Sequence, residues 1–530
     1  MLGIVLIRMF SLKISVILMV GTVACDAAKI LVLSPGGHSH LQQVYTIGKQ
    51  LLKSGSHEIT ALVPEHMKNS PLLNTKEIEV VMFDPGHAAT EALSKEENLK
   101  IQKMVLKGDP IEMGRKMKIL NYEMCISFLR NRELFDRLNA KKFDFAIING
   151  APMARCYYFM LYRLNVSYAT VTTIPSPDMM SSLLNLPSLR APMTLNAEIN
   201  DGNNENTFIW RLKNALVTAM IVWMNYDNQF TSFVPERPPM TVTKLASNSK
   251  IWLVESDGLL DAPQPIMPHI FHVGGLSITK PKQLESKFKA IADEATDSLV
   301  LISFGGYLDF IDEKFYDKIY EALKKLPQFT FIWKMKQHPK EAPPKNVHIF
   351  DWLPQREILA HKNVVLFITH CGNAGQYEAL YSAVPMLGIP FFSDQASNAI
   401  RMYKKGFGRM LHLKTFTTPM LADMIVQMTS NPRYKQAIGK ASALYRLKKP
   451  AIERAAEAIE HVLEHGSDHL RSPAVELEWY QLLMWDVALF LLIAMHALIF
   501  SIGFCFCKCY KCCRRKCSQT RKQEIKPKSQ

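Results

Sequence analysis

Two series of short apolar runs, alternating with helical patterns, most constrain the fold of this 530-residue chain. The runs are bounded by Gly, Pro, Asn or Asp, which is typical of buried strands in parallel βα units. They fall at 29–34, 57–63, 78–83, 144–148 and 168–173, then at 298–303, 329–333, 347–350 and 364–369; helical patterns lie at 39–52, 91–139 and 313–325. The Pro-rich stretch 261–268 separates the two series. We therefore predict an α/β protein of two doubly wound domains whose carboxyl-terminal strand edges face a cleft.

The N-terminus has the pattern of a secretory signal. Arg8 and Lys13 accompany an apolar run over 14–24, and small residues follow at Ala27 and Ala28. This pattern predicts a signal peptide at 1–25, cleaved from the mature chain, with an uncleaved anchor as the alternative.

A second apolar segment, 487–507, has 21 residues without a formal charge. That length crosses a hydrocarbon layer of ~30 Å as a transmembrane helix. The tail 508–530 holds nine basic residues and one acidic residue, a net +8 of the chain's +15. Basic flanks stay in the cytosol, so we expect a single-pass type I membrane protein with residues 26–486 in the lumen. The net positive charge of the chain therefore indicates its orientation in the membrane and does not indicate nucleic-acid binding.

Lys528 and Lys526, third and fifth from the end, resemble the dilysine retrieval signal of endoplasmic-reticulum membrane proteins. With a signal peptide and one span, the expected location is the endoplasmic-reticulum membrane. The sequon at Asn165 is an expected glycosylation site there.

The ten cysteines divide unevenly. Six crowd the membrane exit and tail, namely Cys505, Cys507, Cys509, Cys512, Cys513 and Cys517, where palmitoylation is the favoured reading over metal binding. Whether Cys125 and Cys156 form a disulfide stays open, since nothing local requires it, and Cys371 follows a strand.

The strand ending at Thr369 continues into a Gly-containing turn and a helix. Unpaired N–H groups at the start of that helix favour a diphosphate between Gly372 and Gly375. His370 is placed to donate to phosphates, and Glu378, one helical turn past Gly375, to accept from ribose hydroxyls. Alone, such a turn is weak evidence of nucleotide binding.

The turn belongs to a longer pattern of Trp352-Leu-Pro-Gln355, Thr369-His370-x-Gly372-x-x-Gly375-x-x-Glu378, Pro385, Pro390 and Asp394-Gln395. This pattern resembles the UDP-glycosyltransferase signature, and most closely that of the membrane-bound UDP-glucuronosyltransferases. The linker 263–268 before Gly274-Gly275, Ser303-Phe-Gly305 and Trp485-Asp486 extend the resemblance over nearly the whole chain.

The resemblance implies a GT-B fold of two Rossmann-like domains. Residues 26–275 would bind the acceptor, 286–445 the UDP-sugar, and helices within 446–486 would return to the first domain. UDP-glucuronate or UDP-glucose would be the co-substrate, with no cofactor and no metal. The acceptor would be small and lipophilic, and homo- or hetero-oligomerisation stays open.

The resemblance also implies roles for single residues of the donor site. Trp352 would stack on uracil, and Gln355 would read its edge. His370 and Gly375 would lie at the diphosphate, and Glu378 at the ribose. Asp394 and Gln395 would bind sugar hydroxyls, and Ser303 and Gly305 belong to the first loop of the donor domain.

Ser39-His40, at the start of the first predicted helix, matches the family's Ser-His pair. The resemblance therefore makes His40 the candidate base, a role that suits imidazole because it titrates near working pH. The family orients that histidine with an Asp, but here Asn149 stands in its place. An amide can orient the ring but cannot balance an imidazolium charge. Three explanations stay open: Asn149 lowers turnover, another carboxylate substitutes, or the acceptor is acidic enough to need less help.

Other departures concern the donor. Gln264 stands where glucuronate-using relatives carry Arg, so glucose becomes at least as good a candidate as glucuronic acid. Ala374 replaces the family's Asn, with Asn373 one residue earlier, and Gly306 replaces a Ser or Thr. The prediction is a glycosyltransferase, with a catalytically silent relative that binds UDP-sugar or lipid and regulates an active partner as the alternative.

Overall fold

The computed structural model describes residues 27–34, 37–55, 57–73, 77–86, 100, 122–150, 155–172, 231–261, 263, 266–306, 313–336, 342–391, 394–471, 477, 479–482 and 484–524. The predicted signal peptide and Gln264 lie outside these residues. The chain divides into two compact units, Met1–Arg471 and Ser472–Gln530.

The first domain of the larger unit is built on a seven-stranded parallel sheet of order β3-β2-β1-β4-β5-β6-β7. Its strands are β1 (Lys29–Leu33), β2 (Glu58–Pro64), β3 (Glu79–Phe83), β4 (Phe145–Asn149), β5 (Ser167–Thr172), β6 (Trp252–Val254) and β7 (Ile270–His272). The strand order reverses between β1 and β4. In a sheet of this kind, such a switch point opens a crevice at the carboxyl ends of the strands.

Helices cover both faces of this sheet because β1 is apolar on both. Ile30 and Val32 pack with α2 (His38–Ser54), while Leu31 and Leu33 pack with the helical segment 122–130. That second face also carries α6 (Arg132–Lys141), α7 (Arg155–Leu164) and α10 (Val242–Ser247). A strand that is buried on both faces appears in the sequence as a continuous apolar run, and the strand at 29–34 was predicted from such a run.

The second domain repeats the plan with six parallel strands in the order β10-β9-β8-β11-β12-β13. They are β8 (Leu299–Ser303), β9 (Thr330–Lys334), β10 (Val347–Phe350), β11 (Val364–Thr369), β12 (Met386–Gly388) and β13 (Gly408–Met410). The order reverses between β8 and β11, so this sheet also has a switch point.

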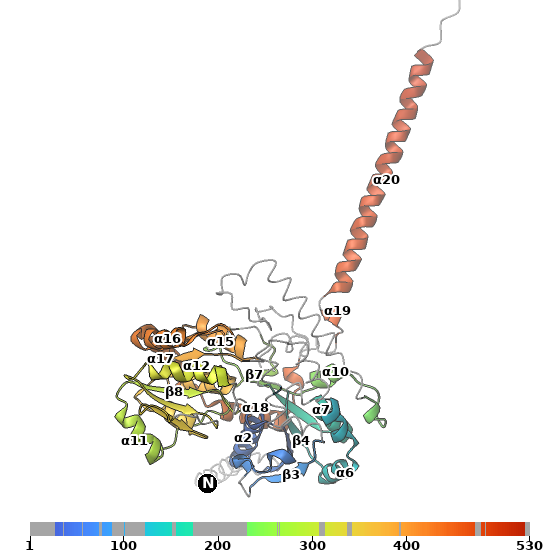
Figure 1. The fold of residues 1–530 in the computed structure, drawn as a ribbon. Helices are drawn as coiled ribbons and strands as arrows, with labels where there is room; N and C mark the ends of the chain where they lie inside the picture. Colours follow the sequence, from blue (N-terminus) through green and yellow to red (C-terminus); the bar gives the residue numbers. More distant parts are fainter. Residues whose placement is uncertain are drawn as a thin grey trace, which may run out of the picture. The chain divides into compact units, whose positions relative to one another are not determined.

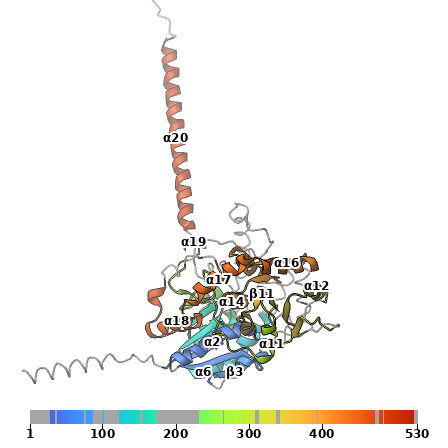
Figure 2. The same cartoon turned by 90° about the vertical axis from the view of Figure 1, so that its left-hand side faces the viewer.

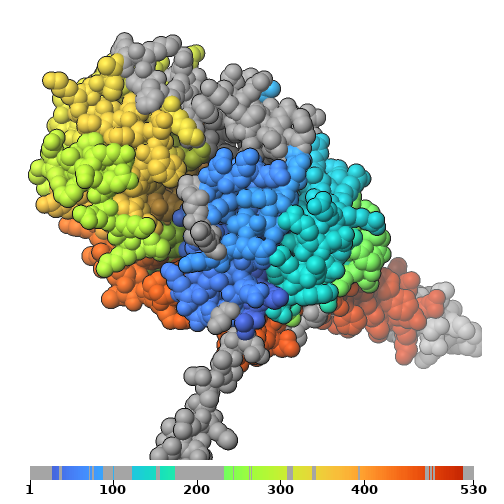
Figure 3. Space-filling model, turned by 90° about the horizontal axis from the view of Figure 1, so that it is seen from below, coloured from blue at the N-terminus to red at the C-terminus, as the bar shows by residue number. Residues whose placement is uncertain are grey.

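Two sets of helices enclose the second sheet. On one face lie α12 (Glu313–Lys324) and α16 (Thr418–Ser430); the other core contains residues of α11 (Ser286–Glu294), α13 (Gln355–Leu359), α14 (Asn373–Tyr381), α15 (Gln395–Lys404) and α17 (Pro432–Arg446). Figure 3 shows the two domains by colour, the first in blue to cyan and the second in yellow-green to yellow.

After the second domain the chain returns to the first. Helix α18 (Ala451–His465) packs against α2, and the two lie side by side in both ribbon views (Figures 1 and 2). Ala455 and Ile459 of α18 belong to the same buried cluster as Val44 of α2. Glu460 accepts hydrogen bonds from Ser54 and pairs with His57, both at 2.9 Å.

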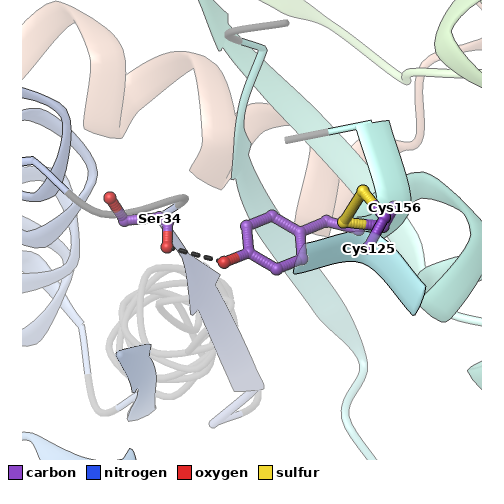
Figure 4. Close-up of a disulfide and its surroundings, with 4 residues drawn as sticks. Ser34, Cys125 and Cys156 are labelled. Carbon is purple, nitrogen blue, oxygen red and sulfur yellow. Dashed lines mark hydrogen bonds between the residues drawn. A yellow bond between two sulfur atoms is a disulfide. The ribbon is translucent and has the colours of Figure 1, made fainter. Parts of the chain in front are cut away.

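A disulfide joins Cys125 in the segment 122–130 to Cys156 in α7, with the Cα atoms 5.1 Å apart (Figure 4). The next residue, Tyr157, donates from its hydroxyl to the carbonyl oxygen of Ser34 at 2.8 Å. The cross-linked helices are thus tied to the carboxyl end of β1. The sequon residue Asn165 is exposed in the turn between α7 and β5.

The smaller unit contains α19 (Trp479–Leu482) and the 40-residue helix α20 (Trp485–Glu524). Within α20, Trp485–Lys516 is long and apolar enough to cross a membrane, with a mean hydropathy of 2.5 in its most apolar window. The predicted C-terminal apolar helix is confirmed, and 487–507 lies inside it.

The predicted fold class is confirmed, with two parallel α/β domains and one C-terminal apolar helix. The four strands absent from the prediction, β6, β7, β12 and β13, have three residues each. Runs this short leave too little alternation or length to be recognised.

Candidate active site

The residues predicted for proton transfer lie at the switch point of the first sheet. His40 is in the first turn of α2, which follows β1, and Asn149 is the last residue of β4. Because β1 and β4 are neighbouring parallel strands, both residues lie at the same edge of the sheet.

His40 is held neutral by its surroundings. Burial disfavours the imidazolium and lowers the pKa of His40 from 6.5 to about 4. A neutral ring at physiological pH can accept a proton, as a general base must.

Asp144 does not stand in for the missing carboxylate. It precedes β4, and its Oδ2 accepts from the N–H of Lys29 at 2.8 Å, at the amino end of β1. Five residues along an extended strand separate Asp144 from Asn149 by roughly 16 Å. Asn149 is itself fully buried at the carboxyl end.

The predicted phosphate loop lies at the switch point of the second sheet. Ser303 ends β8 opposite Thr369, which ends β11, and Gly305 and His370 follow them. A Cβ atom on Gly305 would lie 2.9 Å from Nε2 of His370, and one on Gly372 would lie 2.5 Å from it. Gly305 also has φ +79°, so glycine is required there both for space and for backbone conformation. Burial lowers the pKa of His370 to about 4; a hydrogen bond with the backbone of Ser303 opposes this shift, and the Lys334 charge adds to it.

Trp352 lies outside the core, with 64% of its surface exposed. The Nζ atom of Lys334, at the end of β9, is 5.1 Å from the centre of its ring and donates to the carbonyl oxygen of Gly305 at 2.8 Å. Lys334 therefore places a positive charge between the exposed indole and the phosphate loop. The sequence prediction omitted it, although a lysine ending a strand next to β8 was a usable signal.

Gln355 and Glu378 are brought together. Nε2 of Gln355 donates to Oε2 of Glu378 at 2.5 Å, and a Cβ on Gly375 would lie 3.6 Å from the same Nε2. Burial raises the pKa of Glu378 to about 7, against the opposing effect of this hydrogen bond.

Asp394 and Gln395 begin α15, near the loop that carries His370. Oδ2 of Asp394 accepts from Asn398 at 2.7 Å, and the same amide donates to the carbonyl oxygen of Cys371 at 3.0 Å. Oε1 of Gln395 accepts from the N–H of Phe391 at 2.9 Å. Asn398 thus ties Asp394 to the predicted phosphate loop, and the backbone at Phe391 holds Gln395.

One buried carboxylate bridges the two domains. Glu255 follows β6 and is fully buried; it accepts from Gln43 on α2, from the N–H of Leu276 at 3.1 Å and from Asn373 at 3.0 Å. Burial raises the pKa of Glu255 to about 7, while these donors and Arg401 oppose the rise. Since Gln43 lies three residues after His40, and Asn373 starts α14, Glu255 connects the two halves of the candidate site.

Arg401 extends this contact. It donates to Asn373, to Gln376 at 2.9 Å and to Asp261 at 2.5 Å. The Asn373 amide thus donates to Glu255 and accepts from Arg401 within the interdomain contact. Its side chain is therefore not a replacement for the phosphate ligand lost at Ala374. Sequence reasoning missed Glu255 and Arg401; the only local signal was an acidic residue ending the apolar run at Val254.

Comparisons with known proteins agree with this fold. The family model for UDP-glucoronosyl and UDP-glucosyl transferases matches residues 28–523. UDP-glucuronosyltransferase 2C1 of Oryctolagus cuniculus is 30% identical over 499 residues, covering 89% of this chain and 97% of that protein. UDP-glucuronosyltransferase 1A1 of Mus musculus is 28% identical, covering 94% and 92%.

Solved structures share the fold at low identity. The glycotransferase of kitacinnamycin superposes with a TM-score of 0.59 at 17% identity, covering 82% of this chain and 99% of that chain. The calicheamicin glycosyltransferase CalG4 gives a TM-score of 0.53 at 15% identity, covering 83% and 99%. A family match over nearly the whole chain, on a fold shared with glycosyltransferases, shows that this chain belongs to the UDP-glucoronosyl and UDP-glucosyl transferase family and is a UDP-glycosyltransferase.

Proposed function

We propose that this enzyme transfers a glucuronosyl or glucosyl group from a UDP-sugar to small lipophilic acceptors, with inversion at the anomeric carbon. The observation that carries the proposal is the placement of a neutral histidine at one switch point and of the donor residues at the other. Glu255, which contacts elements of both, supports treating the two edges as one site.

In the proposed reaction, His40 takes the proton of the acceptor hydroxyl. The acceptor oxygen forms a bond to the anomeric carbon while the bond from that carbon to the UDP oxygen breaks, and UDP leaves with the electron pair. Attack from the face opposite UDP inverts the configuration. Asn149 would orient the ring, and the co-substrate would be UDP-glucuronate or UDP-glucose, with no cofactor.

The contacts around each residue support the donor roles that the family resemblance implies. Trp352 offers an exposed face for uracil, and stacking on an aromatic ring is worth about 1–3 kcal/mol per base. Gln355 and Glu378 would bind the nucleoside. His370 would bind the diphosphate together with the loop of Ser303 and Gly305 after β8 and the turn of Gly372 and Gly375 after β11. Asp394 and Gln395 would bind the sugar hydroxyls.

Lys334 would add a charge that compensates for the hydrogen bonds lost at Ala374 and Gly306. Its position beside Gly305 supports this role, because an ammonium attracts the diphosphate through space without needing a fixed geometry.

We also propose a single-pass type I arrangement in the endoplasmic-reticulum membrane with the two domains in the lumen. Helix α20 provides the span, and the Cys125–Cys156 disulfide suits an oxidising compartment. The exposed sequon at Asn165 would be accessible to glycosylation there.

Asn149 favours a second candidate function, that of a catalytically silent UDP-sugar or lipid binder that regulates an active partner. In a serine protease triad, replacing the orienting carboxylate by its amide lowers the turnover ~10⁴-fold. Here Asp144 does not take the place of the missing carboxylate, because it lies at the opposite end of β4.

The test is UDP release from membranes containing the full-length protein, with UDP-glucose and UDP-glucuronate offered separately beside mixed phenols and sterols. His40→Ala should abolish release, and His38→Ala, at the first residue of the same helix, is the matched control. Release from one donor that depends on His40 supports the proposal and identifies the sugar. UDP binding without release above the His40→Ala background supports the silent binder.

A further inference from the structure

Helix α20 continues past the membrane span without interruption (Figure 1). An α-helix crosses ~30 Å in about 20 residues, so a layer entered at Trp485 is left near Cys505. The thiols of Cys505, Cys507, Cys509, Cys512 and Cys513 are exposed and form no disulfide. They occupy the turns where the helix passes from hydrocarbon to headgroups.

The thiols are not scattered around the helix. With about 100° per residue, four of them fall within an arc of about 100°. These are Cys505, Cys509, Cys512 and Cys513, which we call the thiol face. Cys507 falls outside it.

The opposite side of the same turns is basic. Lys508, Lys511, Arg514 and Arg515 fall within an arc of about 120° that excludes the thiol face, and of the basic residues up to 516 only Lys516 shares the thiol side. A basic surface at this depth binds anionic headgroups, and the thiol face lies on the other side of the helix, clear of those contacts.

We propose that the thiol face is a site of S-acylation by long-chain fatty acids. In this step a cysteine sulfur attacks the carbonyl carbon of a long-chain acyl-CoA thioester. A new C–S bond forms to the cysteine, the C–S bond to coenzyme A breaks, and coenzyme A leaves as its thiol with the proton of the cysteine. The inserted chains hold the exit end of α20 at a fixed depth.

Metal binding is a poorer account of the thiol face. Among the described residues no three His, Cys, Asp or Glu side chains gather as ligands, because successive thiols on one helix are spread along its axis. The inference rests on the proposed cytosolic tail, where acyl-CoA is available, and not on the transferase chemistry.

The experiment uses full-length protein in cell membranes. Free thiols are blocked with N-ethylmaleimide, thioesters are cleaved with neutral hydroxylamine, and the thiols released are tagged with a polyethylene-glycol maleimide and resolved by mass. We expect up to four hydroxylamine-dependent tags, all lost when Cys505, Cys509, Cys512 and Cys513 are changed to Ser, and retained in the matched control Cys507→Ser.

Absence of hydroxylamine-dependent tags in the wild type overturns the proposal, as does persistence of the tags in the fourfold variant. Proteolysis of a C-terminal epitope in sealed microsomes locates the tail, and a protected epitope equally overturns it. UDP release from the same membranes is an independent readout, so failure of the transferase proposal is recognised separately.

Discussion

Changing the interdomain carboxylate with Glu255→Gln should remove a pH dependence from the stability of the protein. The side chain is fully buried between Gln43, Leu276 and Asn373, and burial raises its pKa from 4.5 to about 7. The folded state thus binds this proton more tightly than the unfolded state. Stability is full below about pH 4.5 and falls as the pH rises toward 7.

A shift from 4.5 to about 7, at 1.36 kcal/mol per pKa unit, corresponds to about 3 kcal/mol. Glutamine does not titrate, so the variant lacks this loss. It has a constant penalty instead, because one amide oxygen cannot accept from three donors. The free energy of unfolding of the variant minus that of the wild type should therefore rise by about 3 kcal/mol between pH 4.5 and 7 and then level off.

The measurement is urea unfolding of the detergent-solubilised full-length proteins at half-unit steps from pH 4.5 to 8. Taking the difference between variant and wild type cancels the other titrating groups, including the buried Glu378. Glu457→Gln, at an exposed position paired with Lys449, is the control and should give a flat difference. A Glu255→Gln difference that stays flat across this range would refute the reasoning, since the carboxyl would then titrate alike in both states.

Three further results are expected. The acidic limb of the pH–rate profile for UDP release should have its midpoint near 4, not 6.5, because His40 must be neutral to act as base. Asn149→Asp should raise this midpoint, and it should raise the turnover by up to ~10⁴-fold. A rate unchanged by Asn149→Asp argues against an orienting role for Asn149. Trp352→Ala should weaken UDP binding about 5- to 150-fold in equilibrium titration, as loss of one stacked base implies, with intact affinity excluding the stacking role. Cys156→Ser opens a disulfide whose cysteines lie 31 residues apart, so urea unfolding should show a loss of up to about 4 kcal/mol, and unchanged stability would mean that Cys125 and Cys156 do not pair.

Much of the fold could be predicted because the long strands are buried on both faces. Strand β1, for example, gives an uninterrupted apolar run, and a helical pattern follows where α2 begins. The three-residue strands β6, β7, β12 and β13 carry no such signal. These strands form because a neighbouring strand offers backbone hydrogen-bond partners. That pairing depends on the tertiary structure and leaves no pattern in the sequence of the short strand itself.

The candidate site also contains residues that the local sequence could predict and residues that depend on tertiary contacts. Gly372 and Gly375 could be predicted, because both lie in one strand-to-helix turn, whereas Gly305 meets His370 from the loop after the neighbouring strand β8. The bridge from Glu255 to Asn373 joins residues 118 positions apart, and no local pattern links them. Lys334 ends a predicted strand, which was a usable signal, but its contact with Gly305 depends on the pairing of β9 with β8.

The packing of α18 on α2 has a consequence for the order in which this protein is made. Ser54 meets Glu460 across 406 residues, so α2 waits for its covering helix until α18 has been synthesised. At 5–20 residues per second that interval is roughly 20 to 80 s. The second domain has all of its own strands before α18 is made. The first domain is synthesised earlier, but its core is the last to be completed, because α18 covers α2. An apolar helix face left open for this long is a natural place for a chaperone to bind the nascent chain.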